Sequence, residues 1–477
     1  MLKPQKLFLR LQFPFILLKK YLQKYFVYAL GFVAVVLVLI IIFQQLSVSS
    51  LNFFKPSVSE GIVGTYTGDD LPVVVTSLLS DGLVRLDQKG LPQPNLALSW
   101  DVNKEATNYT FKLKDNLRWA DGSPLKASDL SISIQDADIQ ATDDKTLVFK
   151  LADSFSPLPT LLTKPILKKN TLIGIGPYRV DSIEKSGVFI KRINLVSSNN
   201  NLPNVVFRFY PSEKIAKSGL RIGEVQSLLG LNSPGDFASE PPFSLISKTN
   251  FSTLVAIFYN TKDPILSDRN LRLALSFASP SIQNETEAKT SIPPSSWAFN
   301  SEVRDYLDNP DQAKLYLAKV KKGKNDPITL TVTSSLKDVG EKVVAGWNKQ
   351  GFNTKLRVES GVPQNFQALL ISQNIPLDPD QYSLWHSTQV KTNISQYSAP
   401  AQYSPRVDKD LEDGRKSTDL EVRKQKYQDM QKVLLDDAPA TNLYFPKFNV
   451  VYLKKIETNL KKVLDLQLSD LQFATNS

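Results

Sequence analysis

Residues 82–133 read GLVRLDQKGLPQPNLALSWDVNKEATNYTFKLKDNLRWADGSPLKASDLSIS, and this stretch carries the strongest fold signals in the chain. Within it, Tyr109–Leu113 is rich in aromatic and β-branched residues, which predicts a strand. Asp121-Gly122 predicts a turn, because glycine adopts positive φ angles without a steric penalty. Ser128 or Asp129 is suited to cap a short helix after that turn. These residues are expected to build the fold rather than a site.

Outward from this stretch, strand-like runs dominate the first half of the chain and helical patterns appear later. Four more runs are rich in β-branched and aromatic residues: Val73–Ser77, Thr146–Leu151, Val188–Asn194 and Val205–Tyr210. Apolar residues recur at helical spacing in three segments: Arg269–Ala278, Gly340–Gln350 and Leu420–Leu435. A strand is expected over 353–358. The mixture predicts an α/β (mixed α+β) protein with more than one lobe.

The charge balance argues against a nucleic-acid partner. The formal net charge is +10, but residues 1–59 contain seven basic side chains and no acidic one. Removing those seven from the 57 basic residues leaves 50 against 47 acidic residues in the remainder. The main part of the chain is therefore almost neutral, which is not the pattern of a protein that binds nucleic acid.

The N-terminal segment predicts a membrane tether. Residues 26–43 contain no charge and would form roughly 27 Å of helix, close to the thickness of the hydrocarbon core. Six basic residues precede this run and only Lys55 follows closely, so the N-terminus is expected in the cytoplasm and the main domain outside it. We assign 1–25 to a cytoplasmic basic segment, 26–45 to a single-pass anchor in the cell membrane and 46–59 to a linker. A cleaved signal peptide is the alternative, although its apolar run is normally shorter.

An ordered series of motifs resembles the family 5 solute-binding proteins, whose members carry oligopeptides, dipeptides or nickel for ABC importers. The 82–133 stretch matches that family at Gly82, Pro94, Leu96, Ala97, Trp100, Tyr109, Phe111, Leu113, Trp119, Asp121, Gly122, Pro124, Ala127 and Asp129. Later stretches continue the match in the family's order: IGIGPYRV (173–180), DPDQYSLWHSTQVKTNISQYSAP (378–400) and EVRKQKYQDMQKVLLDDAPATNLYFPKFNVV (421–451).

The resemblance implies a periplasmic-binding-protein-like fold, with two lobes, a hinge and a ligand cleft. Lobe I would hold 60–252, with a reduced extra subdomain at about 82–150, and lobe II would hold 253–440. Residues 441–477 would return to lobe I, with crossovers near 250–254 and 440–445. The implied partners are a peptide or other small solute and the permease and ATPase subunits of an ABC importer, and we expect a monomer.

The resemblance also places a candidate site at 378–397. Tyr382, Trp385, Asn393 and Tyr397 would line the cleft, because aromatic faces and an amide suit an extended peptide. Peptide-binding members place an amine-anchoring aspartate before this stretch, but residues 372–377 contain no acid. Asp378 and Asp380 are the candidate replacements. The alternatives are that the two aspartates form a turn around Pro379, and that Tyr382 and Trp385 pack in a core.

Catalytic groups are scarce, so we predict a protein that is not an enzyme. The chain has no cysteine, and its one histidine, His386, lies in a sequence without a nucleophile motif. No phosphate-binding glycine loop or cluster of metal ligands is visible, so no cofactor is expected. The function predicted is capture of peptides or similar solutes for ABC-type import. The alternative is a membrane-tethered ligand sensor or surface binding module without transport.

Overall fold

The computed structural model describes residues 55–320, 326–399 and 403–468, and also positions 24, 25, 32, 35 and 36. The chain divides into two compact units, Met1–Pro56 and Ser57–Ser477. Apart from those five positions, the predicted cytoplasmic segment and the predicted anchor lie outside the described residues. Among the described residues, no helix has both the length and the apolar character needed to cross a bilayer.

In the described part of the second unit, a seven-stranded sheet has the order β12-β19-β11-β1-β10-β9-β8. Its central strand β1 pairs in parallel with β10 and β11, and the outer pairs are antiparallel. The bounds are β1 (Ser57–Val63), β8 (Tyr178–Ser186), β9 (Phe189–Ser197), β10 (Asn204–Tyr210), β11 (Ser227–Leu231), β12 (Phe243–Thr249) and β19 (Lys447–Leu453). Residues 57–59, predicted as linker, therefore belong to this first sheet.

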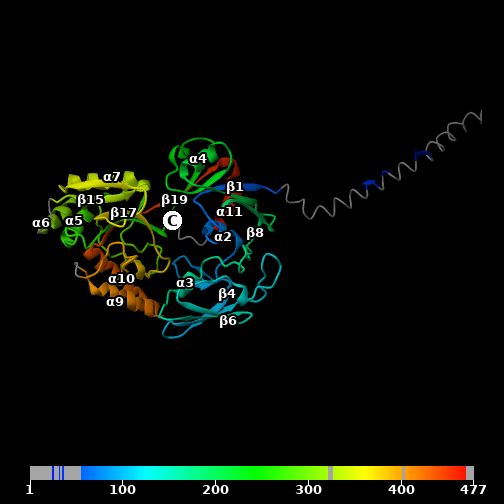
Figure 1. Ribbon diagram of the computed structural model, residues 1–477, viewed down its shortest axis with the longest axis horizontal. Helices are drawn as coiled ribbons and strands as arrows, with labels where there is room; N and C mark the ends of the chain where they lie inside the picture. Colours follow the sequence, from blue (N-terminus) through cyan, green and yellow to red (C-terminus); the bar gives the residue numbers. More distant parts are fainter. Residues whose placement is uncertain are drawn as a thin grey trace, which may run out of the picture. The chain divides into compact units, whose positions relative to one another are not determined.

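Helices cover both faces of the first sheet (Figure 1). On one face, α2 (Val73–Leu79) and α11 (Glu457–Gln467) pack over strand residues such as Val58 and Phe207. On the other face, α4 (Glu213–Arg221) packs over Tyr210 and Leu228. These apolar contacts form the core of this part of the chain.

The strand predicted over Val73–Ser77 is wrong, because these residues belong to α2. Val74, Val75, Leu78 and Leu79 are buried, which is the spacing of one helix face, and α2 packs against α11. Three consecutive valines favour a strand by local preference, but packing on the sheet outweighs that preference.

The stretch that opened the sequence analysis supplies two of the four strands, β4 and β5, of a separate antiparallel sheet with the order β4-β5-β7-β6 among the described residues. Its strands are β4 (Ala97–Val102), β5 (Asn108–Leu113), β6 (Ala137–Asp143) and β7 (Thr146–Leu151), preceded by the short pair β2 (Val84–Leu86) and β3 (Pro92–Pro94). Tyr109, Phe111, Trp119 and Phe149 form its core with α3 (Leu158–Leu161). The turn at Asp121-Gly122 is confirmed, with Gly122 at φ +85°.

The short helix predicted after Asp129 is absent from this described segment. Ala127–Asp129 form a single 3₁₀ turn, and Leu130 is extended. Leu130 then pairs with Lys168 and the Ser131 N–H donates to the Leu167 carbonyl. These backbone contacts with residues 167–168 replace the hydrogen bonds that a helix would supply.

A six-stranded second sheet has the order β14-β18-β13-β17-β15-β16 in the described chain. Its strands are β13 (Thr253–Tyr259), β14 (Thr286–Glu287), β15 (Ile328–Thr333), β16 (Thr354–Glu359), β17 (Ala368–Asn374) and β18 (Ala440–Phe445). α5 (Arg269–Ala278), α6 (Pro310–Lys319) and α7 (Lys337–Lys349) contribute to the core on one face. α8 (Tyr382–Trp385), α9 (Pro405–Lys416) and α10 (Leu420–Asp437) contribute to the core on the other.

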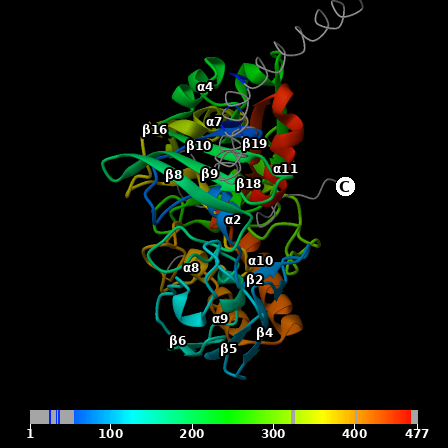
Figure 2. The same cartoon turned by 90° about the vertical axis from the view of Figure 1, so that its right-hand side faces the viewer.

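The chain crosses between the two large sheets twice. β12 leads to β13 through residues 250–252, and β18 leads to β19 through Pro446 alone. Residues 441–445, which the sequence places in the return to lobe I, instead pair with β13 and β14 in the second sheet. Figure 2 shows β18 and β19 close together at the junction of the two sheets.

Gly174, in the IGIGPYRV stretch, lies where two backbone segments approach closely. A Cβ atom on Gly174 would lie 1.9 Å from the Leu79 carbonyl oxygen. Gly174→Ala is therefore expected to lower the free energy of unfolding by about 1–3 kcal/mol, since the backbone must shift. Urea denaturation measures this change. Gly361→Ala is the control, because nothing lies within 4 Å of its Cβ position; equal effects of the two substitutions would contradict the prediction.

Candidate ligand-binding site

The turn at Asp378-Pro379-Asp380 positions the candidate site after β17. The Asp380 N–H donates to Asp378 Oδ1 at 3.0 Å, and the Tyr382 N–H donates to Asp380 Oδ1 at 3.1 Å. Both aspartates thus stabilise successive turns that lead into α8, as Asx turns commonly do. The interpretation of these residues as a turn is borne out. The hydrogen bonds of the turn involve only the Oδ1 atom of each aspartate, so the Oδ2 atoms can bind other partners.

Both aspartates are buried and form ion pairs with arginines from α9 and α10. Arg423 Nη2 lies 2.6 Å from Asp378 Oδ1, and Arg415 Nε and Nη2 each lie 2.8 Å from Asp380 Oδ2. Burial raises the pKa of Asp380, while Arg415 acts in the opposite direction. Two negative and two positive charges balance here, so a ligand ammonium group would have to compete with an arginine for either carboxylate.

Tyr382 lies at the edge of this ionic cluster. The Arg415 guanidinium carbon lies 4.1 Å from the centre of the Tyr382 ring. The other neighbour of that ring is His386, stacked at a centroid distance of 4.0 Å. The partly buried Tyr382 is therefore held between a cation and an imidazole.

Trp385, Asn393 and Tyr397 are buried, with exposures of 3%, 2% and 0%. Trp385 stacks on Phe258 of β13 and donates its indole N–H to Gln381 Oε1. Asn393 exchanges hydrogen bonds with the backbone of Tyr397, whose hydroxyl donates to Asp437. Their polar atoms therefore have partners within the protein, and contact of these side chains with a ligand stays a prediction.

His386 has no arrangement suited to nucleophilic catalysis within the described residues. Its ring nitrogens lie 2.8 Å from Thr388 Oγ1 and 3.3 Å from Glu412 Oε1. The adjacent Ser387 hydroxyl donates to Asp408 rather than to the imidazole. This geometry stabilises the packing of α8 on α9 and lacks the serine–histidine contact of a hydrolase.

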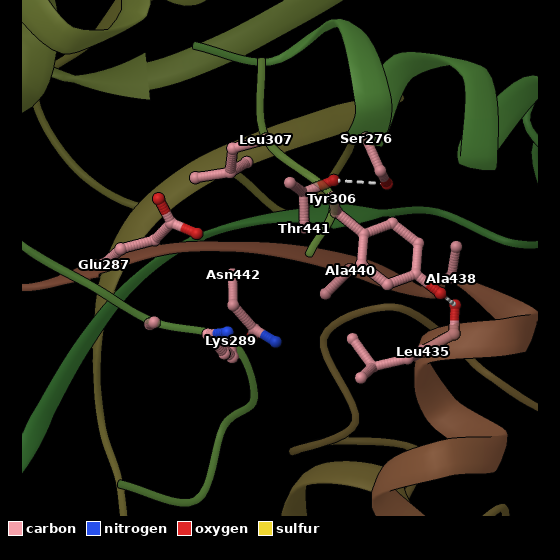
Figure 3. Close-up of a pocket in the computed structure, with 11 residues that line it drawn as sticks. Ser276, Glu287, Lys289, Tyr306, Leu307, Leu435, Ala438, Ala440, Thr441 and Asn442 are labelled. Carbon is pink, nitrogen blue, oxygen red and sulfur yellow. Dashed lines mark hydrogen bonds between the residues drawn. The ribbon is translucent and has the colours of Figure 1, made fainter. Parts of the chain in front are cut away.

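Cavities beside α10 are too small for a solute. The pocket drawn in Figure 3 has a volume of about 10 Å³, and the Ser276–Thr441 and Tyr306–Leu435 hydrogen bonds bound it. A second pocket, which Trp385 and Gln431 help to line, measures about 20 Å³. Such volumes hold about one water molecule.

A larger cavity lies beside α3 and was not predicted from the sequence. Its volume is about 330 Å³, which is within the range of small-molecule sites. Apolar side chains form much of the wall and a few polar groups are interspersed. The lining residues are Ser131, Ile132, Ser133, Ile134, Gln135, Leu161, Leu162, Lys164, Pro165 and Ile166. We call this the α3 cavity.

The α3 cavity and the ionic cluster are neighbours through α3 itself. Thr160 Oγ1 donates to Asp378 Oδ2 at 3.5 Å, while the next two residues, Leu161 and Leu162, line the cavity. Arg415, Arg423 and Thr160 were not identified from the sequence. Their partners are distant in the chain, so no local pattern marks them.

The fold is of the periplasmic-binding-protein-like type, with a mixed α/β architecture. The model of the bacterial extracellular solute-binding proteins, family 5, matches residues 92–137 and 131–395. The chain belongs to this family, which consists of binding proteins of transporters rather than enzymes.

Individual relatives agree with this assignment. The dipeptide-binding protein of Escherichia coli K12 is 24% identical over 433 residues, which cover 73% of this chain and 79% of that protein. The oligopeptide-binding protein AppA of Bacillus subtilis is 23% identical over 470 residues, covering 82% and 85%. The crystal structure of the ABC transporter substrate-binding protein CtaP from Listeria monocytogenes superposes with a TM-score of 0.68 at 19% identity, covering 84% and 94%.

Proposed function

We propose that this protein captures a peptide or a solute of similar size outside the cytoplasm and delivers it to the permease and ATPase subunits of an ABC importer. The observation that carries the proposal is the family match over residues 92–395, which includes the residues that line the α3 cavity and the two aspartates of the ionic cluster. The names of the two relatives, one dipeptide-binding and one oligopeptide-binding, support a peptide as the class of ligand.

The ionic cluster also indicates how the solute would be held. Because Asp378 and Asp380 are already paired with arginines, a free α-amine has no unpaired carboxylate in the cluster. The proposed ligand is therefore held mainly through apolar contacts and backbone hydrogen bonds. N-acetylated peptides are expected to bind as well as the same peptides with a free amine.

Thermal unfolding of the full-length protein in detergent tests this proposal. A peptide present at a hundred times its Kd is expected to raise the free energy of unfolding by about 2.7 kcal/mol. Mass spectrometry of the purified protein would identify a ligand that remains bound. If neither free nor acetylated peptide pools raise the melting temperature, and no solute co-purifies, the proposed capture function is refuted.

A paired substitution tests the α3 cavity. Leu161 is 42% exposed and lines the cavity, so Leu161→Asp is expected to leave the protein folded and to remove most of the peptide-induced shift in melting temperature. Leu98→Asp is the control, because Leu98 is 59% exposed and does not line the cavity. Equal peptide-induced shifts in the two variants would exclude the cavity as the binding site.

We also propose that residues 26–45 anchor the protein in the cell membrane, with the N-terminus in the cytoplasm. The uncharged run and the preceding basic residues support this topology. The expected result is that the protein stays in the membrane pellet after alkaline carbonate extraction, with an intact mass that includes residue 1. A released protein that begins after residue 45 would support cleavage instead.

A further inference from the structure

The chain has two sheet-bearing parts: residues 57–249 and 447–453 hold the first sheet and the small sheet, and residues 253–445 hold the second sheet. A set of contacts joins these two parts far along the chain from both crossovers. The contacts involve Phe155, Ser156 and Thr160, which lie between β7 and β8, and Asp378 and Arg415, which lie between β17 and β18. The covalent connections are at residues 250–252 and at Pro446. In both Figure 1 and Figure 2, α9 lies well below β19 along the vertical axis.

Arg415 is the centre of these contacts. Its guanidinium carbon lies 4.1 Å from the ring centre of Tyr382, which belongs to the same part of the protein. The same carbon lies 5.1 Å from the ring centre of Phe155, which belongs to the other part. Its ion pair with Asp380 fixes the guanidinium plane in this position. An arginine can be covered by two rings in this way, whereas a lysine ammonium lacks the planar surface for it.

The backbone of α9 reinforces the contact. The carbonyls of the last helical turn have no partner within a helix. Here the Ser156 N–H donates to the Arg415 carbonyl at 2.9 Å, and the Ser156 hydroxyl donates to the Gly414 carbonyl at 3.3 Å. The C-terminal end of α9 is therefore capped by a residue of the other part of the protein.

Phe155 and Ser156 are in turn fixed on the small sheet. The Phe155 N–H donates to the Ala106 carbonyl, and the Tyr109 hydroxyl donates to the Phe155 carbonyl, both at 3.0 Å. The same segment continues into α3, and Leu161 at its end and the following Leu162 line the α3 cavity. Separation of Phe155 from Arg415 would consequently displace a wall of that cavity relative to α9.

We propose that Arg415 is the positioning residue of a clasp, formed with Phe155, Ser156 and Asp380, that holds the two sheet-bearing parts in their closed arrangement without ligand. This inference rests on the proposed function. In it, the clasp sets the equilibrium between the closed and open forms, and that equilibrium governs how long a solute is retained. The apparent affinity for a ligand is proportional to the fraction of protein in the binding-competent form, so it falls when that fraction falls.

The absence of cysteine from the chain makes distance measurement direct. The exposed residues Lys112 in β5 and Lys432 in α10 are replaced by cysteines, and a pair of fluorophores is attached to them. Single-molecule energy transfer between the fluorophores, on the full-length protein in detergent and without peptide, then measures the fraction of open protein. Phe155→Leu keeps an apolar side chain without the ring face, and Arg415→Lys keeps the charge facing Asp380. Each is expected to raise the ratio of open to closed protein about three- to tenfold.

A double-mutant cycle and a control decide the result. The double variant is expected to open little more than either single variant, since both remove the same contact. Phe189→Leu, at the exposed start of β9, is expected to leave the ratio unchanged. Unchanged ratios in the folded Phe155 and Arg415 variants, or fully additive effects, would overturn the clasp. Because no peptide is present, these outcomes do not depend on whether the protein binds peptide.

Discussion

Replacing Arg423 with alanine is expected to lower the free energy of unfolding by about 3–5 kcal/mol. The side chains of Arg423 and Asp378 are only 9% and 7% exposed, and their closest atoms lie 2.6 Å apart. Removal of the guanidinium leaves the Asp378 carboxylate buried without its cation. Arg423 Nε also donates to the Gly414 carbonyl at 3.1 Å, so a second buried bond is lost. Chemical denaturation at neutral pH measures the change.

Arg406→Ala is the matched control for this prediction. Arg406 also joins α9 to α10, through Asp429, but its side chain is 62% exposed. Exposed ion pairs of this kind typically contribute less than about 1 kcal/mol. A loss of similar size in the two variants would mean that burial of the Arg423–Asp378 pair does not determine its importance.

Glu60 is expected to give the protein a strong pH dependence of stability. Its carboxylate oxygen Oε2 accepts a hydrogen bond of 2.6 Å from Gln467 Nε2, and both residues are fully buried. The other oxygen of each side chain, Glu60 Oε1 and Gln467 Oε1, has no partner among the described residues. A proton on Glu60 converts one of these two acceptors into a donor, so the neutral acid suits this pair better than the carboxylate.

The pH range and direction follow from the pKa of Glu60. Burial raises this pKa from 4.5 to about 7, with the Gln467 hydrogen bond acting in the opposite direction. The unfolded chain releases the proton near pH 4.5, whereas the folded protein keeps it until about pH 7. The free energy of unfolding is therefore expected to fall between these values, by about 3 kcal/mol at 1.36 kcal/mol per pKa unit, and then to level off.

Glu60→Gln isolates this contribution. The substitution keeps a hydrogen-bonding amide opposite Gln467 and removes the titrating group. Asp410, whose pKa burial raises to about 6, contributes equally to both proteins and cancels in their difference. Urea denaturation of each protein at several values between pH 4.5 and 7.5 gives the comparison. Parallel pH profiles for the two proteins would show that Glu60 does not carry the effect.

The fold could be predicted from the sequence wherever local and tertiary preferences agree. The helix predicted over Arg269–Ala278 and the strand predicted over Thr146–Leu151 coincide with α5 and β7. In the strand, the alternation of apolar residues matches the buried face, and in the helix a mostly apolar sequence is buried on all sides from Leu271 to Ala278. The prediction failed at Val73–Ser77, where β-branched residues form a helix because the apolar faces of α2 and α11 pack together there.

The site was predictable only in part, for a similar reason. The family resemblance located residues 378–397, and the structure brings Asp378, Asp380 and Tyr382 together with α3. The family resemblance could not identify Arg415 or Arg423, because their ion pairs depend on how α9 and α10 pack against residues 378–382. The α3 cavity was missed because its walls come from two segments that meet only in the folded chain.

The position of β19 sets the order in which the protein can assemble. This strand lies between β11 and β12 in the first sheet. In the sequence, however, all strands of the second sheet come between β12 and β19. Synthesis of the residues between 249 and 453 takes roughly 10–40 s at typical rates. During that time β12 lacks its neighbour, whereas the small sheet, built from residues 97–151, can already close. Nascent chains would therefore depend on protection of an open sheet edge until the last strand emerges.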